Sequence, residues 1–362
     1  SKALIAAGKQ AYSMGHTGDL GVKAVKADVD FAAAKDHVRR VIETIEPVDS
    51  QERFEGFGVN VIREFGKFIS PTEVQAGDTI IQARRFIVAT GSGPLVPPIP
   101  GLEDVDVYTN ENIFDLRERP EHLIIVGGGP IGMEMAQAHL RLGCKVTVIE
   151  GAKAMGKDDP EMAAIVLDKL RAEGVEIIEE AQATKISGSK GAKSKVTVHT
   201  PKGDFTGSHL LMAVGRKVNV ESLDLDKADV KWGRGGVEVG ADLRSVSNKK
   251  VYAVGDAAGG LQFTHVAGYH AGVVIRSMLF GLPSKQRTDH IPWATYTDPE
   301  LAQVGLTEAQ AKEKFCGNVD VVRFPYHEND RAIAEGKTTG LIKVMVVKGK
   351  PVGASIVGAM AG

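Results

Sequence analysis

Glycines at residues 127, 129 and 132 form the pattern with the clearest chemical meaning in this sequence. They lie in GGGPIG, which follows the apolar segment LIIV and opens an amphipathic stretch. In that setting the first glycine permits a tight turn, the second lets the backbone approach a pyrophosphate, and the third lets a helix pack closely on a strand. The helix N-terminus offers N–H groups and a positive dipole to the phosphates. The predicted dinucleotide site comprises Gly127, Gly128, Gly129, Pro130, Ile131, Gly132 and Glu134.

An acidic residue about 20 positions after the glycines completes this signature. Glu150 ends the apolar segment VTVIE, where a carboxylate can hold ribose hydroxyls. The same negative charge would repel the additional phosphate of NADP, so NAD is the expected dinucleotide. The nearby Lys153 and Lys157 leave NADP as an alternative.

Further turns at the ends of apolar segments indicate a second dinucleotide besides the first. These turns contain Thr90, Gly91 and Ser92 in FIVATGS, Gly215 and Arg216 in LLMAVGR, and Gly255 and Asp256 in VYAVGDAAG. A carboxylate at position 256 can accept hydrogen bonds from a polyol such as the ribityl chain of a flavin. Taken alone, a Gly-Asp pair would more often be a plain turn former.

The composition favours an ordinary globular protein and excludes several other classes. The chain has 362 residues, of which 43% are hydrophobic and 25% are charged, with a formal net charge of −2. This length suggests two or three domains, and the interspersed charges favour no nucleic-acid partner. We expect no membrane span, because no run of about 18 apolar residues occurs. The N-terminal segment also lacks a signal-peptide layout, so a cytoplasmic location is expected.

Cysteine usage predicts neither a disulfide framework nor a metal site. The sequence contains only Cys144 and Cys316, which are far apart. Cys144 lies at the start of an apolar strand, so we expect a small buried thiol there.

The predicted elements change in type along the chain. The first 50 residues show helical spacing of apolar residues, and Gly56 to Gly91 shows short alternating stretches typical of a β-meander. Residues 120–235 alternate strands with helices, which predicts βαβ units and a parallel sheet, with a hairpin around KVTVHTPKGDFTG. VYAVGDAAG then predicts a buried strand with a helix behind it. From Pro292 onward the pattern is mixed α and β.

The segments ATGS, GGGPIGMEMA, AVGRKVN and VYAVGDAAG, in this order and spacing, closely resemble the class I pyridine nucleotide-disulfide oxidoreductases. This flavoprotein family includes dihydrolipoamide dehydrogenase, mercuric reductase and glutathione reductase. The opening SKAL and Glu150 are more similar to the first two than to the third. The resemblance implies an α/β fold with two Rossmann-like dinucleotide-binding domains, the FAD domain being incomplete, and a C-terminal α+β interface domain.

The resemblance also implies domain boundaries. Residues 1–119 would form the first part of the FAD domain without its N-terminal strand, and residues 239–288 its second part. Residues 120–238 would form the NAD domain. Residues 289–362 would form a truncated interface domain that makes a homodimer, where Tyr296, Asp298 and Glu300 resemble the dimer segment.

Roles of single residues follow from the same resemblance. Gly127 to Glu134 and Glu150 would hold NAD, with Gly215 near its nicotinamide end and Ala183 near the adenine, and Arg216 is also expected to bind a cofactor. The residues that would contact FAD are Lys2, Gly66, Thr90, Gly91, Ser92, Gly255, Asp256, Gln262, Phe263, Thr264 and His265. Lys2 and Glu134 resemble a charged pair that lies beside the flavin ring and biases hydride transfer. The alternative for Glu134 is an exposed helix residue.

The sequence departs from the family pattern at both ends. The redox-active cysteines and the first glycine fingerprint of the FAD domain would precede Ser1, and the family's His and Glu acid-base pair would follow Gly362. His327 does not match the position of that pair. We expect the flanking regions to be omitted from the sequence rather than absent from the protein, because a Rossmann sheet without its first strand would expose an unpaired edge.

The implied reaction of the intact protein is hydride transfer from NADH to FAD, and then electron transfer through a redox disulfide to a disulfide or metal-ion acceptor. The residues present cover the NADH-to-FAD half. One alternative is an NADH-dependent flavin oxidase or diaphorase without a disulfide step. The other is a nucleotide-binding fragment without turnover. The expected partners are a small-molecule or disulfide substrate and a second copy of the chain.

Overall fold

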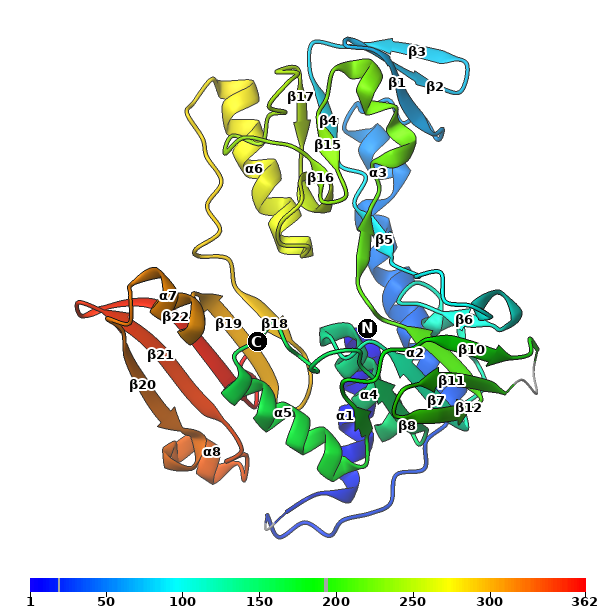
Figure 1. Cartoon of the computed structure of the whole chain (residues 1–362), viewed down its shortest axis with the longest axis vertical. Coiled ribbons are helices and arrows are strands. Elements are labelled where there is room, and N and C mark those ends of the chain that lie inside the picture. Colours follow the sequence, from blue (N-terminus) through cyan, green and yellow to red (C-terminus); the bar gives the residue numbers. More distant parts are fainter. Residues whose placement is uncertain (19, 192–194) are drawn as a thin grey trace. The chain divides into compact units, whose positions relative to one another are not determined.

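The computed structural model of the chain describes residues 1–18, 20–191 and 195–362. These residues divide into two structural units, each assembled from segments that are distant in sequence (Figure 1). The first unit contains Ser1–Ile45, Pro94–Gly215 and Pro292–Gly362, and the second contains Glu46–Gly93 and Arg216–Ile291. Within the described ranges, no helix has the length and apolarity that crossing a membrane requires. These units are defined by how the chain packs, whereas the predicted domains are defined by the cofactor that each would bind. The predicted domain boundaries therefore stay predictions.

A parallel sheet forms the centre of the first unit. Its strands, in spatial order, are β6 (Val107–Tyr108), β13 (His209–Met212), β7 (His122–Val126), β8 (Lys145–Ile149) and β9 (Glu176–Ile178). Helix α4 (Pro130–Arg141) connects β7 to β8, and α5 (Pro160–Glu173) connects β8 to β9. The predicted βαβ units are confirmed. Because β13 lies on the opposite side of β7 from β8, the strand order reverses at β7, which is where ligands bind in such sheets.

The two faces of this sheet are covered by different elements. Leu123 and Ile125 pack with the helices, in one cluster with Met133 and Met162. Ile124 faces the opposite side, because neighbouring strand residues point to opposite faces, and it packs in a second cluster. That cluster includes residues of an antiparallel sheet made of β10 (Lys185–Gly188), β11 (Val196–Thr200) and β12 (Gly203–Gly207). The β11–β12 pair is the predicted hairpin.

The predicted N-terminal helices are α1 (Lys2–Gly15) and α2 (Phe31–Ile45). Helix α1 packs against both α2 and α4. Gly8 permits a close approach, because a side-chain carbon there would lie 3.1 Å from the carbonyl oxygen of Ala138. The apolar spacing of the first 50 residues therefore corresponds to helices that cover α4.

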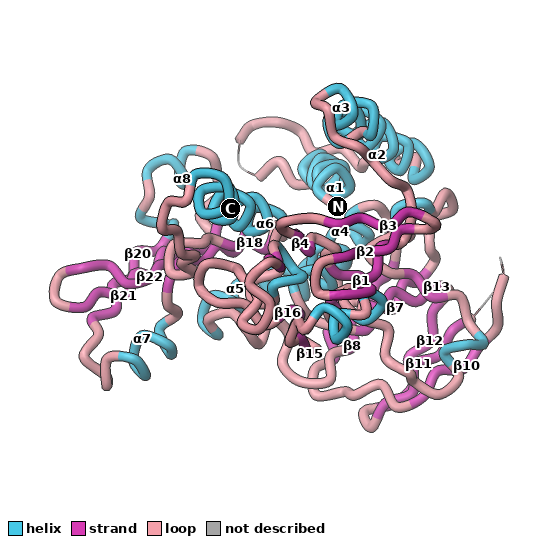
Figure 2. Tube along the Cα trace, turned by 90° about the horizontal axis from the view of Figure 1, so that it is seen from above, coloured by secondary structure: helices cyan, strands magenta, loops and turns pink. Residues whose placement is uncertain are grey.

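The C-terminal part of the first unit is an antiparallel sheet with short helices, as the mixed pattern predicts. The strand order is β18 (Trp293–Thr295), β19 (Glu300–Gly305), β22 (Lys350–Gly358), β21 (Leu341–Val347) and β20 (Asp320–Pro325). Figure 2 shows β20, β21 and β22 as neighbouring magenta strands. The helices are α7 (Glu308–Lys314), which begins with a capping box of Thr307 and Gln310, and α8 (Asp330–Ala334).

The second unit contains smaller sheets and helices. Strands β1 (Gly66–Ser70), β2 (Glu73–Ala76) and β3 (Thr79–Gln82) form a meander, and β4 (Phe86–Val88) pairs in parallel with β17 (Val251–Ala253). The remaining elements are α3 (Gln51–Gly56), β5 (Ser92–Pro94), β14 (Arg216–Val218), β15 (Trp232–Gly233), β16 (Gly236–Val237) and α6 (Thr264–Phe280).

The predicted meander begins later than the sequence pattern suggests. Its first strand starts at Gly66 rather than near Gly56, and residues 59–65 form no regular element. Phe65 is 95% exposed, so the alternation in this segment does not reflect packing of one face on a core.

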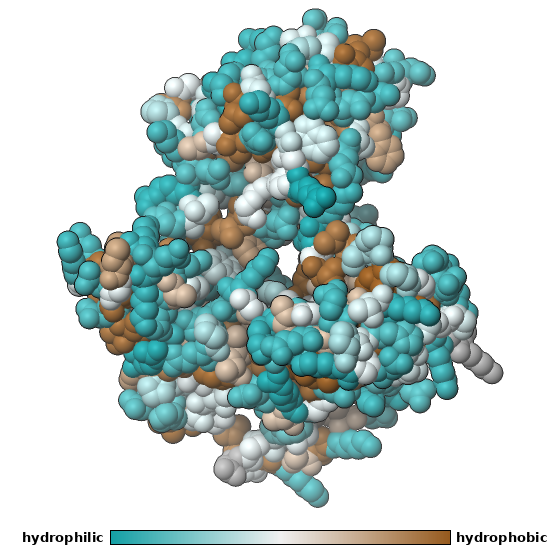
Figure 3. Space-filling model, in the orientation of Figure 1, coloured by the Kyte–Doolittle hydropathy of each residue, from teal (hydrophilic) through white to brown (hydrophobic). Residues whose placement is uncertain are grey.

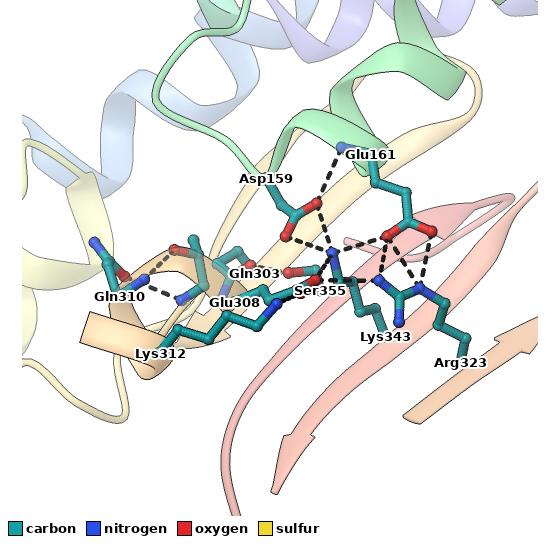
Figure 4. A network of polar contacts seen from close by, with 10 residues as sticks. Asp159, Glu161, Gln303, Glu308, Gln310, Lys312, Arg323, Lys343 and Ser355 are labelled. Atoms are coloured by element: carbon teal, nitrogen blue, oxygen red, sulfur yellow. Dashed lines mark hydrogen bonds and ion pairs between the residues drawn. The ribbon is translucent and has the colours of Figure 1, made fainter. Parts of the chain in front are cut away.

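A buried lysine connects α5 to the C-terminal sheet (Figure 4). Lys343 on β21 is 2% exposed, and its Nζ lies 2.8 Å from Asp159 Oδ2, 2.8 Å from Glu161 Oε2 and 2.5 Å from Glu308 Oε2. Asp159 also caps α5 by accepting a hydrogen bond of 3.1 Å from the Glu161 N–H. Arg323 on β20 contacts Glu161 at 2.8 Å and Glu308 at 3.1 Å. The network therefore joins the N-terminus of α5 to two strands of the C-terminal sheet.

We predict that Lys343→Met destabilises the chain by about 3 kcal/mol, because the buried Asp159 carboxylate would lose its cation. Urea unfolding followed by circular dichroism would measure the change. Lys312→Met is the matched control, since Lys312 is 52% exposed and also pairs with Glu308. The control should change stability much less. Equal losses in the two variants would contradict a special role of the buried lysine.

Candidate nucleotide-binding sites

The turn between β7 and α4 has no room for side chains at two of its glycines. Gly127 has φ +113°, and a side-chain carbon there would lie 2.4 Å from the carbonyl oxygen of Ala213. A side-chain carbon at Gly132 would lie 2.0 Å from the carbonyl oxygen of Gly127. At Gly129, by contrast, an added carbon would meet no described atom within 4 Å. The turn is thus closed on the sheet side and open at the N-terminus of α4, where a pyrophosphate would bind.

Glu150 is held in place beside this turn. Its Oε2 accepts a hydrogen bond of 2.7 Å from the Gly128 N–H, and its Oε1 accepts one of 2.8 Å from the Ala152 N–H. Because a carboxylate oxygen has two lone pairs, both oxygens can still accept hydrogen bonds from ribose hydroxyls. The residues at this edge therefore fit the dinucleotide that the sequence predicts.

The other residues predicted to contact NAD have different environments. Gly215 follows β13, the neighbour of β7, and has φ +137°. Ala183 is 6% exposed and packs in the apolar cluster that contains Ile149 and Ile186. The contacts of Gly215 with the nicotinamide end and of Ala183 with the adenine stay predictions.

Glu134 and Lys2 meet around Tyr296 in the first unit. Glu134 Oε1 accepts a hydrogen bond of 2.9 Å from the Tyr296 N–H, and Lys2 Nζ lies 4.4 Å from the centre of the Tyr296 ring. Burial raises the pKa of Glu134, while the hydrogen bond from Tyr296 and the charge of Lys2 act in the opposite direction. The alternative of an exposed helix residue is wrong, because Glu134 is half-buried and hydrogen-bonded.

A polar cluster in the second unit lies at the carboxyl ends of β4 and β17. Ser92 Oγ donates a hydrogen bond of 2.5 Å to Asp256 Oδ2, and Arg216 Nε donates one of 2.7 Å to Ser92 Oγ. The chain turns at Gly91 and Gly255, which have φ +65° and +59°. Since parallel strands bind ligands at their carboxyl edge, the cluster fits the polyol part of a flavin nucleotide.

The remaining residues predicted to bind FAD are distributed over both units. Gly66 begins β1 and pairs with Ala76. Gln262 to His265 lead into α6, and the rings of Phe263 and His265 stack with their centres 5.5 Å apart. Lys2 belongs to the first unit, whereas the others belong to the second. Their shared contact with one FAD stays a prediction.

Sequence reasoning missed several polar partners of these sites. The sequence indicates a dimer segment for Tyr296 and does not identify its N–H as the hydrogen-bond donor to Glu134. Asn219 Nδ2 donates a hydrogen bond of 3.1 Å to the carbonyl oxygen of Thr90. The Gly255 N–H donates a bond of 3.1 Å to Nδ1 of the buried His270. Only the occurrence of Asn219 within AVGRKVN offered a signal in the sequence.

The surroundings of the two cysteines and of His327 differ from those of the polar clusters described above. Cys144 is 3% exposed, which confirms the predicted packing, and burial raises the pKa of its thiol to about 12. Cys316 is exposed. His327 lies in a short 3-10 helix, Tyr326–Glu328, before β21 and β22, as its sequence position indicates.

Comparison with known proteins identifies relatives over the whole chain. Residues 3–271 match the family described as pyridine nucleotide-disulphide oxidoreductase, and residues 291–362 match its dimerisation domain. A mercuric reductase of Lysinibacillus sphaericus is 31% identical over 347 residues, covering 95% of this chain and 63% of the relative. A dihydrolipoyl dehydrogenase of Geobacillus stearothermophilus is 31% identical over 373 residues, covering 99% of this chain and 77% of the relative.

Solved structures agree with these relatives. The HOCl-induced flavoprotein disulfide reductase RclA from Escherichia coli has a TM-score of 0.84 and 28% sequence identity, covering 99% of this chain and 79% of that chain. The chain spans only 55% to 63% of the length of the first three mercuric reductases that it matches.

We predict that Gly129→Ala and Gly132→Ala have different effects. The methyl group at residue 129 has space in the folded chain but would obstruct a pyrophosphate, so NADH binding should weaken roughly tenfold while stability is kept. The methyl group at residue 132 would clash with the Gly127 carbonyl, so stability itself should fall. Thermal unfolding and calorimetric titration with NADH measure the two effects. Loss of stability in both variants would argue against an open phosphate position at Gly129.

A second prediction concerns the pH dependence of stability. A carboxyl whose pKa is raised by folding binds its proton more tightly in the folded chain, so its stabilising contribution is lost as pH rises above the usual value of 4.5. Glu134→Gln keeps an acceptor for the Tyr296 N–H and removes this ionisation. The variant should therefore gain stability relative to the parent as pH rises from 4 to 7. The free energy of unfolding, measured with denaturant at each pH, tests this prediction. Glu43→Gln, at an exposed glutamate, is the control. If the free energies of unfolding of the parent and of Glu134→Gln change in parallel with pH, the prediction is wrong.

Proposed function

The chain belongs to the pyridine nucleotide-disulphide oxidoreductase family, and we propose that it binds NADH and FAD in an FAD-dependent disulfide or metal-ion oxidoreductase. Members of this family bind FAD and NAD(P). The observation that carries the proposal is the polar cluster at the carboxyl edge of parallel strands in each unit, which we propose binds a nucleotide. Glu150 marks one of these sites and Asp256 marks the other.

The residues of the first unit would bind and orient NADH. The α4 N-terminus would hold the pyrophosphate, and Glu150 would accept hydrogen bonds from the ribose. NAD is proposed over NADP because Glu150 would repel a 2′-phosphate. Glu134, held by the Tyr296 N–H, and Lys2 are proposed as the charged pair that orients the reacting ring.

The residues of the second unit would hold FAD. Asp256 accepts a hydrogen bond from Ser92 and lies 3.7 Å from Arg216 Nε, so its carboxylate is fixed where it can bind polyol hydroxyls. When bound, FAD supplies the two-electron step by accepting a hydride from NADH and passing the electron pair to an acceptor.

The terminal acceptor is proposed from the relatives, which include mercuric reductases and dihydrolipoyl dehydrogenases. A disulfide step needs a thiolate. Cys144 does not supply one near neutral pH, since the pKa of its buried thiol is raised to about 12, and Cys316 lies far from it in sequence. The raised pKa of the Cys144 thiol also fits a second candidate, an NADH-dependent diaphorase that passes electrons directly from flavin to an added acceptor.

A homodimer is a further part of the proposal. Residues 291–362 match a dimerisation domain, and β20 is an edge strand of the C-terminal sheet. Its Val322 and Phe324 are 55% and 40% exposed, and Figure 3 shows hydrophobic residues among hydrophilic ones over this sheet. Exposed apolar side chains on an unpaired edge favour a protein partner. We also propose that the protein acts in the cytoplasm, where NADH is available.

The proposal is tested by the visible absorption spectrum of the chain reconstituted with FAD, before and after anaerobic addition of NADH. The flavin band should appear and then bleach. Asp256→Ala should weaken FAD binding roughly tenfold or more, because hydrogen bonds to a charged group are lost, whereas Glu221→Ala, which removes an exposed carboxylate of the same unit, should not.

The spectrum also separates the candidates. A long-wavelength charge-transfer band on reduction of the intact protein supports a disulfide step, and bleaching of the intact protein without that band supports the diaphorase. If the chain retains no flavin, or if NADH does not bleach it, the proposed function is wrong.

A further inference from the structure

Two lysines beside the predicted ribose site share one glutamate. Glu180 Oε1 lies 2.9 Å from Lys153 Nζ, and Glu180 Oε2 lies 3.6 Å from Lys202 Nζ. Lys153 lies three residues after Glu150, and its neighbour Ala152 donates a hydrogen bond to Glu150 Oε1. The segment that carries Lys153 therefore contacts the carboxylate that would hold the ribose, and the Lys153 ammonium group pairs with Glu180.

The backbone fixes Glu180 beside this segment. The Glu180 N–H donates a hydrogen bond of 2.8 Å to the carbonyl oxygen of Ala152, and the Ala181 N–H donates one of 2.8 Å to that of Glu150. The Glu150 N–H in turn donates a bond of 2.8 Å to the carbonyl oxygen of Ile178. The segment after β9 and the segment after β8 are thus joined at the residues that carry both carboxylates.

Glu180 adopts a backbone conformation that its side chain disfavours. Its φ is +53°, in the left-handed region that glycine and asparagine adopt more readily. Its side chain is 57% exposed, so core packing does not require a glutamate there. Unfavourable backbone conformations at exposed residues are concentrated at functional sites.

The charges indicate what that function is. The 2′-phosphate that distinguishes NADP from NAD carries about −1.5 to −2 charges at neutral pH, and lysines are the side chains that would attract it here. While Glu180 pairs with Lys153 and Lys202, its negative charge offsets their positive charge and leaves them less available to a phosphate. We propose that Glu180 is a specificity residue that withholds Lys153 from a 2′-phosphate and so favours NADH over NADPH. This inference rests on the proposed function of the Glu150 site.

Exposed ion pairs are weak and are screened by salt, so the expected effect is moderate. In Glu180→Gln, NADPH should bind about three- to fivefold more tightly than in the parent at low salt. NADH binding should stay within about twofold, because the contacts of Glu150 are unchanged. The gain should shrink as salt is added. Calorimetric titration of the chain with NADH and with NADPH measures both affinities without requiring turnover.

Matched variants separate a specific effect from a general change in charge. Glu221→Gln removes the same charge from an exposed glutamate that pairs with Lys217 at 2.6 Å, and it should leave the NADPH-to-NADH ratio unchanged. Glu180→Gln combined with Lys153→Gln should return the ratio to that of the parent. Glu180→Asn, whose side chain tolerates the left-handed conformation, repeats the test if the glutamine variant folds poorly.

The outcomes are distinguishable. An unchanged ratio in both the glutamine and asparagine variants overturns the role of Glu180, and a gain that persists without Lys153 overturns it as well. If the parent binds NADH and only the ratio fails to respond, the proposed nucleotide site stands and this inference is wrong. If the parent binds neither nucleotide, the Glu150 site and this inference are both wrong.

Discussion

At the turn between β7 and α4, a side-chain carbon on residue 132 would lie 2.0 Å from the carbonyl oxygen of Gly127. Only a backbone without a side chain fits this space, and the close approach brings the N-terminus of α4 to the carboxyl end of β7. The rest of the site follows from it. The Gly128 N–H reaches Glu150 Oε2 at 2.7 Å, and the Gly128 carbonyl oxygen accepts a hydrogen bond of 2.8 Å from the Met155 N–H. One steric constraint therefore positions the helix dipole, the carboxylate of Glu150 and the segment after β8.

Local patterns were sufficient to predict the elements around this turn. LIIV and VTVIE correspond to β7 and β8, because continuous apolar runs indicate strands that are covered on both faces. Glycine spacing encodes close backbone approach, which is why Gly127 and Gly132 could be assigned before the fold was known. The start of the meander was predicted less well. The alternation before Gly66 includes the exposed Phe65, and periodicity alone does not show whether a core exists to receive one face.

Polar partners that are distant in sequence could not be predicted from such patterns. Glu134 accepts its hydrogen bond from Tyr296, which is 162 residues away, and Ser92 meets Asp256 across 164 residues. A sequence shows that a residue is polar, but its partner depends on how strands and helices pack. The pKa of Glu134 illustrates the consequence, since its direction is set mainly by burial, which a helical pattern on α4 does not reveal.

The C-terminal sheet holds both helices that border the proposed NADH site. Gln137 on α4 exchanges hydrogen bonds of 2.9 and 2.8 Å with the backbone of Asp298, and Lys343 pairs with Asp159 at the start of α5. Asp159 directly follows the segment that carries Glu150 and Lys153. Because Gln137 and Lys343 are buried, a displacement of the C-terminal strands would disturb the start of α5 or the side of α4. Residues 291–362, which match a dimerisation domain, thus also support the proposed nucleotide site, and docking of a partner against them would act on the elements that we propose orient NADH.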